Sequence, residues 1–440
     1  MIDDDIERLT IRQVSFRLLP FLFALYIFSY LDRANVGIAA LQMNGELKFS
    51  SAAFGLGAGI FYIGYSLFEV PSNLILARTG ARRWLARIAV SWGILACAMM
   101  WIRTPTQFYT VRFLLGVAEA GFFPGVIYYL SRWFPAVYRG RAMAGFLIAI
   151  PLSQALSGSL GGALLGLSGV GHLSGWQWLF LVEGFPSILL GVFALGYLTD
   201  SPEEARWLSA ERRDWLSGRL ERERQQTVTA HASPLRALGN PLVWILSFPY
   251  FAYYNIALGL VFWAPTLVRD ALGTSNFATG LVTGAISLLA AAVYPLAGML
   301  SDRRDERCGL SAVGLLLGCA GCIGVALLPH SPLRVVGLVA MALCSPVFMS
   351  SFWCLPTKFL KDTSAAAGIA LISAIGASGG FVGPSMIGFL KQTAGGEAGA
   401  FFGLAALALV AGLLCIVLRR LAVFRPAPRV IGTAQAIRRA

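Results

Sequence analysis

Twelve long apolar blocks run through this chain of 440 residues, and they constrain its fold more than any other feature. Most are around 20 residues long, the length that a helix needs to cross a hydrocarbon core about 30 Å thick. Too little sequence remains between them for a soluble core. The blocks therefore predict an all-α membrane protein with 12 transmembrane helices, over residues 16–40, 53–77, 84–102, 107–131, 141–166, 176–198, 241–268, 279–300, 310–329, 333–357, 365–390 and 399–418.

One long polar segment divides the blocks into two sets of six. The predicted organisation is an N-terminal six-helix bundle over residues 1–198, a cytoplasmic linker over 199–240, and a C-terminal six-helix bundle with a basic cytoplasmic tail over 241–440. Within the linker, residues 202–226 have helical spacing, with acids early and bases later, which favours a surface helix. Two related bundles with a substrate bound between them are a common plan for a transporter.

The net charge of +13 follows membrane topology rather than a nucleic-acid surface. If the N-terminus is cytoplasmic, most Lys and Arg residues fall in cytoplasmic loops and tails. The outer loops then hold only Lys48, Arg103, Arg269, Arg334 and Lys391. This asymmetry is the positive-inside pattern, and it places both termini in the cytoplasm. The acidic start of the chain lacks the basic residues and cleavage site of a secretory signal.

The sequence offers no chemistry for an enzyme. Cys319 and Cys322 form a CxxC without His or acidic neighbours, so we interpret these cysteines as packing residues. A membrane enzyme is a rival interpretation, but no metal cluster, nucleophile–base pair or phosphate loop occurs at usable spacing, which argues against an enzyme and against an ATP-driven pump. The pattern predicts a protein that is not an enzyme, needs no cofactor beyond a proton gradient, and binds no metal or nucleic acid.

Four ionisable residues lie inside apolar blocks of the first half, namely Asp32, Arg33, Arg112 and Glu119. A charge at membrane depth costs at least a few kcal/mol, so it is rarely kept without a use. With a helix rise of about 1.5 Å per residue, Arg33 lies about 24 Å from the start of its span and Arg112 at a similar depth. Glu119 follows Arg112 by seven residues, so the two share a helix face.

The turns after the second and eighth blocks resemble the loop motif of the major facilitator superfamily. The first copy contains Arg78, Gly80 and Arg82, with Asn73 and Ala77 where Gly and Asp are typical. The second copy is a closer match and contains Gly298, Asp302, Arg303 and Arg304. The resemblance implies a major facilitator fold, and the motif residues are expected to act in gating.

Longer strings are similar to the anion:cation symporter family, whose members carry tartrate, 4-hydroxyphenylacetate, phthalate or D-galactonate and include the sialin group. The matching strings are YLDRANVGIAAL at 30–41, GYSLFEVPSNLIL at 64–76, RFLLGVAEAGFFPGVIYYLSRWFP at 112–135, GWQWLFLVEGFPSILLG at 175–191 and FWCLPTKFL at 352–360. The resemblance implies a monomeric multi-pass transporter in the bacterial inner membrane, working by alternating access on a small organic anion and protons.

These residues suggest proton-coupled anion transport. Arg33 presents a planar fork that matches a carboxylate. Glu119 and Asp32 can lose charge and are expected to carry protons, while Arg112 is expected to hold Glu119 ionised until the anion competes for it. The matching positions of galactonate-type carriers have similar roles.

Further candidates for the substrate site are aromatic or polar residues within spans. Tyr30 and Tyr65 match family positions near the site, Ser350 and Trp353 match substrate-side positions, and Ser373 stands where many relatives have Asn. With the two arginines, the predicted substrate-binding set comprises Arg33, Arg112, Tyr30, Tyr65, Gln154, Tyr253, Asn255, Ser350, Trp353 and Ser373. We read Glu69 and Glu183 as structural, since each lies close to a proline.

The sequence favours import of an organic carboxylate by proton symport. An anion exchanger or exporter with the same fold remains an alternative, as does a membrane receptor that does not transport. Tartrate, a hydroxylated aromatic acid, phthalate and an aldonate all remain open as substrates.

Overall fold

The fold is described by a computed structural model that covers residues 2–227, 239–304, 307–359, 362–393 and 396–421. It contains 12 helical spans that are long and apolar enough to cross a membrane, which confirms the predicted fold class. The helices of the first six spans are α1 (Ile2–Glu46), α2 (Ser51–Thr79), α3 (Ala81–Ala98), α4 (Pro105–Glu119), α5 (Phe122–Ser131), α6 (Ala136–Leu147), α7 (Ala149–Leu165) and α8 (Gly175–Tyr197).

The linker carries a short 3-10 turn, η3 (Pro202–Glu204), and the helix α9 (Ala210–Thr227). The last six spans are α11 (Pro241–Leu272), α12 (Asn276–Arg304), α13 (Arg307–Leu327), α14 (Arg334–Phe352), α15 (Asp362–Leu390) and α16 (Gly396–Leu418). Short 3-10 turns also occur at η1 (Met99–Trp101), η2 (Val170–His172) and η4 (Pro356–Lys358).

The fourth span is broken directly after Glu119. A capping box between Thr104 and Gln107 starts α4, and the helix ends where Gly121 adopts a positive φ of 83°. Such a backbone favours glycine, which has no Cβ to clash. The hydroxyl of Ser72 donates to the carbonyl oxygen of Ala120 at 2.6 Å, which satisfies a backbone acceptor at the break. The break therefore fixes the end of the helix that carries Arg112 and Glu119.

The two largest differences from the predicted boundaries lie at the start of α1 and at the start of the linker helix. Helix α1 begins at Ile2, whereas the predicted block begins at residue 16. The linker helix begins at Ala210 instead of Pro202, because the preceding residues form a separate 3-10 turn. The first turns of α1 are joined to the linker by hydrogen bonds. The side-chain amide of Gln13 donates to the carbonyl oxygen of Trp207 at 2.8 Å and accepts a hydrogen bond from Arg212 at 2.7 Å.

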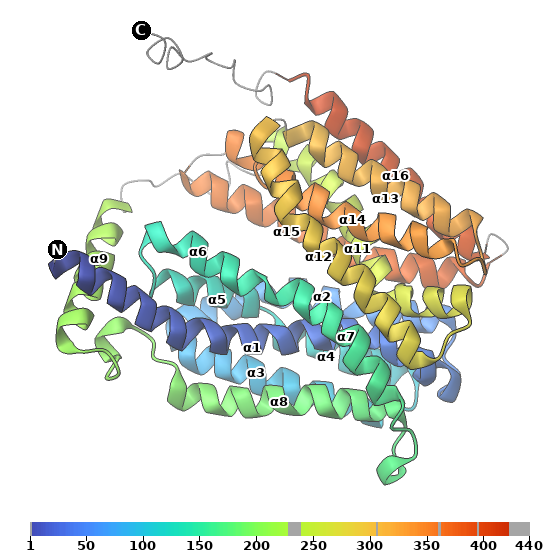
Figure 1. The fold of residues 1–440 in the computed structure, drawn as a ribbon, viewed down its shortest axis with the longest axis horizontal. Coiled ribbons are helices and arrows are strands. Elements are labelled where there is room, and N and C mark those ends of the chain that lie inside the picture. Colours follow the sequence, from blue (N-terminus) through green and yellow to red (C-terminus); the bar gives the residue numbers. More distant parts are fainter. Residues whose placement is uncertain (1, 228–238, 305–306, 360–361, 394–395, 422–440) are drawn as a thin grey trace, which may run out of the picture.

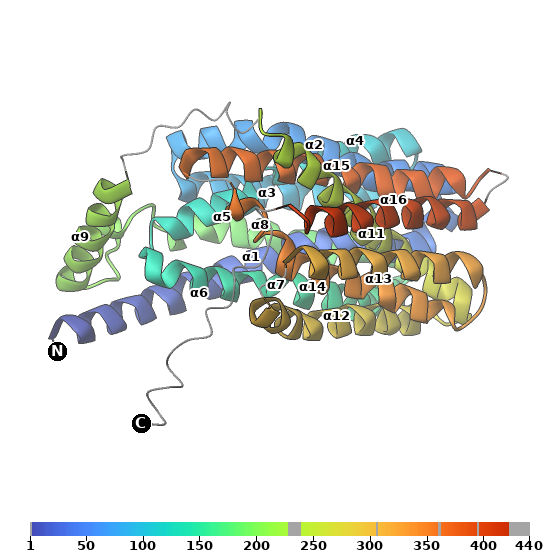
Figure 2. The same cartoon turned by 90° about the horizontal axis from the view of Figure 1, so that it is seen from above.

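The two sets of six helices lie side by side, with the N-terminal set in blue to green and the C-terminal set in yellow to red (Figure 1). The N-terminus and α9 lie at the same end of the molecule, and Figure 2 shows this from above. We call this the linker end, and we call the other end of the helices the opposite end.

Close backbone contacts join the two halves toward the opposite end. A Cβ added to Gly55 would lie 2.4 Å from the carbonyl oxygen of Pro384, and one added to Gly280 would lie 2.0 Å from that of Gly158. A side chain of Arg269 also donates to the carbonyl oxygen of Leu41 at 2.6 Å. Small residues allow helices in a membrane to pack at such short range. The halves are therefore closed against each other at the opposite end.

We expect Gly55→Ala to weaken this closure. Its methyl group would enter the backbone of α15, and such overpacking costs about 1–3 kcal/mol. The measurement is maleimide labelling of a cysteine introduced at Ser385, which donates to the carbonyl oxygen of Gly55, in a chain without native cysteines. Labelling should be faster than in the same chain carrying Gly196→Ala, because nothing lies within 4 Å of that glycine. Equal labelling in both chains would contradict the closed contact.

Candidate functional site

An ion pair between α1 and α4 forms the centre of the site. Arg33 donates to Glu119 Oε1 through Nε at 3.0 Å and Nη2 at 2.7 Å, and the hydroxyl of Ser29 donates to the same oxygen. Glu119 is 1% exposed and the side chain of Arg33 is 13% exposed. The second carboxylate oxygen, Oε2, is buried and has no partner among the described residues. Glu119 therefore concentrates its hydrogen bonding on one oxygen that faces the arginine.

Aromatic rings surround the guanidinium of Arg33. Its carbon Cζ lies 5.0 Å from the ring centroid of Tyr30, 5.0 Å from that of Tyr65 and 5.4 Å from that of Phe61. At this range a ring face attracts a cation. The structure thus brings the predicted residues Tyr30 and Tyr65 to Arg33 from two different helices.

The structure corrects the predicted partner of Arg112. Arg112 is fully buried and donates to the carbonyl oxygens of Gly57 at 3.3 Å and Ala58 at 3.2 Å instead of bonding to Glu119. Asp32, which is 3% exposed, and Glu119 are both within electrostatic range of Arg112. Only Arg33 and Glu119 form an ion pair across α1 and α4, because helical spacing predicts a shared face but not which neighbouring helix supplies the hydrogen-bond partner.

The C-terminal half contributes an aromatic wall. The ring of Tyr250 stacks on Phe352 at 5.2 Å and meets Trp353 edge-on at 4.8 Å and Tyr254 at 5.0 Å. Tyr250 is almost fully buried, whereas Tyr254 and Trp353 are only partly buried. Tyr253 stacks on Phe348 behind them at 5.0 Å. The wall thus has a buried aromatic backing and two partly exposed rings in front.

The two halves meet next to the residues around Arg33, at Tyr62, whose ring meets that of Phe61 edge-on at 5.1 Å. Toward the opposite end, Tyr62 meets Phe262 edge-on at 6.4 Å and packs on the backbone of Gly380. The residues around Arg33 are therefore closed off from the opposite end. Sequence reasoning missed Ser29 and Tyr62 as site residues, although Ser29 lies one helical turn before Arg33.

Other predicted residues have different positions. Asn255 is fully buried, donates to the carbonyl oxygen of Phe251 at 2.8 Å and packs on Gly379, so here it serves helix packing instead of facing the site. Ser350 donates to the carbonyl oxygen of Pro346 at 2.6 Å. Gln154 and Ser373 are half-buried on α7 and α15, and among the described residues no hydrogen bond joins them to Arg33.

The first loop motif is anchored within the N-terminal half. Gly80 has a φ of 90°, and the backbone amide of Arg82 donates to Asp200 at 2.8 Å. Asp200, which follows α8, thus supplies an acid at the turn where the motif lacks one at Ala77. Arg78 is exposed.

Asp302 and Arg303 of the second loop motif were predicted to act in gating, and their side chains lie outside the described residues. Within the described ranges, no three His, Cys, Asp or Glu side chains gather as a metal site.

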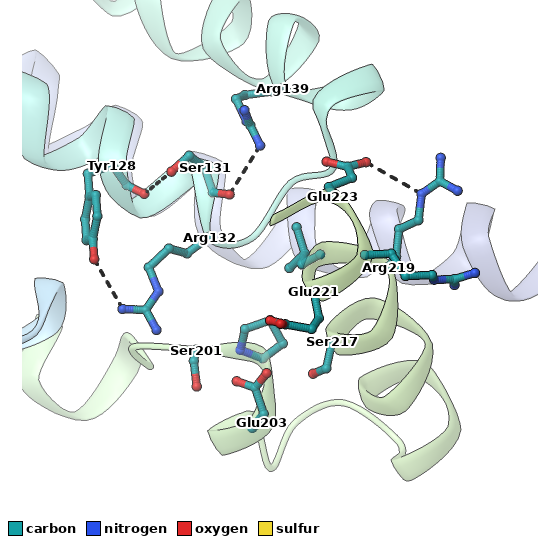
Figure 3. Close-up of a pocket in the computed structure, with 13 residues that line it drawn as sticks. Tyr128, Ser131, Arg132, Arg139, Ser201, Glu203, Ser217, Arg219, Glu221 and Glu223 are labelled. Carbon is teal, nitrogen blue, oxygen red and sulfur yellow. Dashed lines mark hydrogen bonds and ion pairs between the residues drawn. The ribbon is translucent and has the colours of Figure 1, made fainter. Parts of the chain in front are cut away.

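A separate pocket of about 1170 Å³ lies at the linker end, between the α5–α6 turn and the linker (Figure 3). Arg132 approaches Tyr128 at 3.5 Å, and Arg219 pairs with Glu223 at 3.6 Å. Burial alone would raise the pKa of the exposed Glu203 carboxyl, but hydrogen bonding with Ser201 and the charge of Arg132 lower this pKa overall.

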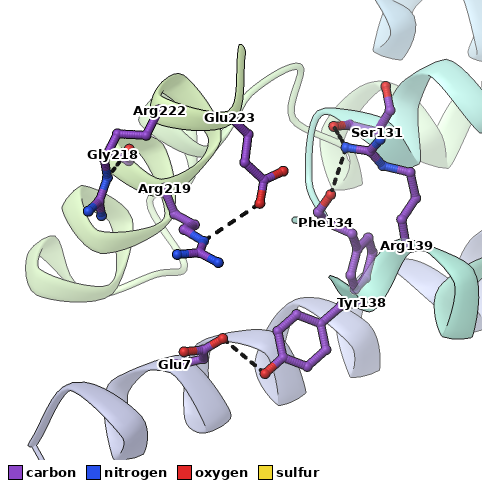
Figure 4. A network of polar contacts seen from close by, with 9 residues as sticks. All are labelled: Glu7, Ser131, Phe134, Tyr138, Arg139, Gly218, Arg219, Arg222 and Glu223. Carbon is purple, nitrogen blue, oxygen red and sulfur yellow. Dashed lines mark hydrogen bonds and ion pairs between the residues drawn. The ribbon is translucent and has the colours of Figure 1, made fainter. Parts of the chain in front are cut away.

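Next to the pocket, the hydroxyl of Tyr138 donates to Glu7 at 2.9 Å, and Arg139 donates to the carbonyl oxygens of Ser131 and Phe134 (Figure 4). These contacts tie α1 to α6 and order the turn before α6. Together with the contacts of Gln13 to the linker, they hold the linker on the N-terminal half. The pocket is therefore separate from the cluster around Arg33.

Comparison with known proteins agrees with this architecture. The family model of the Major Facilitator Superfamily matches residues 22–384 and 268–436. A protein from Agrobacterium vitis named putative tartrate transporter is 43% identical over 427 residues, covering 96% of this chain and 97% of its own. The quinolone resistance transporter of Acinetobacter baumannii is 41% identical, covering 90% and 92%. The putative metabolite transport protein NicT of Pseudomonas putida is 40% identical, covering 92% and 93%.

Solved structures show the same fold. A bacterial homologue of the human lysosomal transporter Spinster superposes with a TM-score of 0.75 at 18% identity, covering 93% of this chain and 98% of its own. The xylose transporter XylE from E. coli superposes with a TM-score of 0.70 at 16% identity, covering 92% and 99%. From the 12 spans, the family match and these relatives, the chain belongs to the Major Facilitator Superfamily and is a transporter, not an enzyme.

Proposed function

We propose that this protein imports an organic carboxylate together with protons by alternating access. The observation that carries the proposal is the buried pair of Arg33 and Glu119. Arg33 is a permanent cation that suits a carboxylate, and its present partner is itself a carboxylate. A substrate anion can therefore take the place of Glu119 without changing the kind of bond that Arg33 makes.

Proton coupling follows from this exchange. When the anion binds Arg33, Glu119 loses its cation in a buried environment, where an unpaired carboxylate is costly. Protonation of Glu119 removes that cost, so binding of the anion and of a proton favour each other. Asp32 is a second candidate proton carrier, and Arg112 lies within electrostatic range of it.

The orientation follows from the distribution of basic residues. Under the positive-inside rule the linker end faces the cytoplasm, with both termini, and the closed opposite end faces outward. The state described here is then closed to the outside. We propose the bacterial inner membrane as the location and a monomer as the transporting unit, since the site lies between the two halves of one chain.

The surroundings of Arg33 favour a substrate with a flat body. Four partly exposed rings offer stacking surfaces, namely those of Tyr30, Tyr65, Tyr254 and Trp353. The hydroxyl of Ser350, in contrast, donates to a carbonyl oxygen of its own helix. Planar rings prefer stacked or edge-on contacts with aromatic side chains. We therefore place an aromatic or otherwise planar acid ahead of a polyhydroxylated acid such as tartrate, although two relatives are named putative tartrate transporters.

Export is the second candidate, because one relative at 41% identity is named a quinolone resistance transporter. Import and export can be distinguished by transport in proteoliposomes with a proton gradient. A proton symporter accumulates the acid in the compartment that protons enter. An exporter that exchanges protons for its substrate removes the acid from the compartment that corresponds to the cytoplasm.

We expect Arg33→Lys to lower carboxylate uptake at least about tenfold, because lysine loses the two-point contact and charge-assisted hydrogen bonds are worth about 1.5–3 kcal/mol. Glu119→Gln should abolish uptake driven by a proton gradient but keep counterflow of the same acid. Both are measured in proteoliposomes, with Arg103→Lys in an exposed loop as the control. Near-normal gradient-driven uptake in either variant would refute the assignment.

Removal of Arg112 should destabilise the fold. Arg112→Met leaves Asp32 as a buried charge without compensation, which costs about 3–5 kcal/mol. The unfolding temperature in detergent should fall clearly, and adding Asp32→Asn should restore part of it. If the two substitutions lower stability additively, the proposed pairing of Arg112 with Asp32 is wrong.

The aromatic wall should set substrate preference. Tyr254→Leu should raise KM for benzoate by about two- to tenfold, since an aromatic pair is worth about 0.5–1.5 kcal/mol, and should leave KM for tartrate nearly unchanged. The ratio of the two KM values is compared with that of Trp101→Leu, a surface tryptophan that is 65% exposed. An unchanged ratio would argue against a planar substrate.

A further inference from the structure

A second carboxyl lies deep in the N-terminal half, away from the ion pair. Glu183 sits in the middle of α8, is 2% exposed, and neither of its oxygens has a hydrogen-bond partner among the described residues. This differs from the structural role expected from its place near Pro186, because a structural tie needs a partner. Helix α8 packs tightly on α3 at this level, where a Cβ on Gly184 would lie 2.9 Å from the backbone nitrogen of Cys97.

Burial without a partner determines the charge of Glu183. An ionised carboxylate that is removed from water and unpaired is far more costly than a neutral acid. In a membrane span this cost makes such a residue a functional candidate by default. Glu183 therefore holds a proton in the state described here.

Helix α1, which carries Asp32, and helix α3, which carries Cys97, both pack on α8. The thiol of Cys97 donates to the carbonyl oxygen of Leu181, two residues before Glu183, at 4.0 Å, and Asp32 acts on Glu183 electrostatically. The oxygen Oδ2 of Asp32 is buried and has no hydrogen-bond partner among the described residues. Two carboxyl groups that interact at close range titrate as a pair, and one of them tends to keep a proton.

We propose that Glu183 is a second proton-binding site that exchanges a proton with Asp32 during transport, an inference that rests on the proposed proton symport. The O–H bond of Glu183 breaks and a new O–H bond forms on Asp32, with no electron transfer. Negative charge passes to Glu183, and a new proton then neutralises it because a carboxylate has no partner there.

Through this exchange, a proton could reach the four buried charges of α1 and α4 without passing the substrate-binding residues. Asp32 lies within electrostatic range of Arg112, Glu119 and Arg33. A proton that arrives on Asp32 weakens its hold on Arg112 and removes a negative charge near Glu119. The site thus links α8 with the ion pair between α1 and α4.

The test is Glu183→Gln, which keeps the size and neutrality of the protonated acid but cannot release a proton. Reconstituted full-length protein is assayed with the acid that the wild type transports best, by gradient-driven uptake across a pH series and by counterflow at equal pH. We expect gradient-driven uptake to fall at least about tenfold with a flatter pH profile. Counterflow should remain within about twofold of the wild type, which shows that the variant folds and binds.

The matched control is Ser187→Ala, one turn further along the same face of α8, where a buried hydroxyl is also without a partner. It should behave like the wild type. Infrared difference spectra provide a second readout: the C=O stretch of a protonated carboxylic acid in the wild type should be lost in Glu183→Gln.

Two outcomes would overturn the inference, namely an unchanged pH profile of uptake in Glu183→Gln or no loss of the acid band. The absence of gradient-driven uptake in the wild type would instead overturn the proposed function itself, so the two failures can be told apart.

Discussion

The buried ion pair of Arg33 and Glu119 is the interaction on which the arrangement of the N-terminal half depends. It joins α1 to α4 through two hydrogen bonds to one carboxylate oxygen, and Ser29 adds a third. Desolvation of two charges is costly, so the pair persists only because hydrogen bonds and the rings of Tyr30 and Tyr65 compensate for lost water. An interaction with so small a net gain is well suited to replacement by a substrate anion.

Closure at the opposite end depends on a different kind of contact. Glycines in α2, α7 and α12 let backbones of the two halves approach within a distance that a side chain would prevent. The glycine contacts are made by packing alone, and the hydrogen bond from Arg269 to the carbonyl oxygen of Leu41 adds to them, so few polar contacts have to break when the halves separate. The tight contacts lie toward the opposite end, and the charged and aromatic residues of the site lie between them and the linker end.

Much of the fold could be predicted because its determinants are local. The length of each apolar block sets the helices, and the resemblance to the family indicated Tyr30 and Tyr65 as neighbours of the site. Prediction was incomplete where partners come from distant sequence: Arg112 was expected to hold Glu119 ionised, but the hydrogen bonds of Arg112 go to the backbone of α2. Asn255 was predicted to bind the substrate, but its side chain packs against Gly379 of α15 instead.

By itself, the sequence determined the number of spans, their division into two sets and the positions of four charges at membrane depth. These follow from hydrophobic length and from the cost of burying charge, both of which are read along a single chain. Only the tertiary structure decided which charges pair, which rings surround Arg33 and that Glu183 lies buried without a partner. The reason is that pairing and desolvation depend on side chains from helices far apart in sequence, and their distances are set by packing.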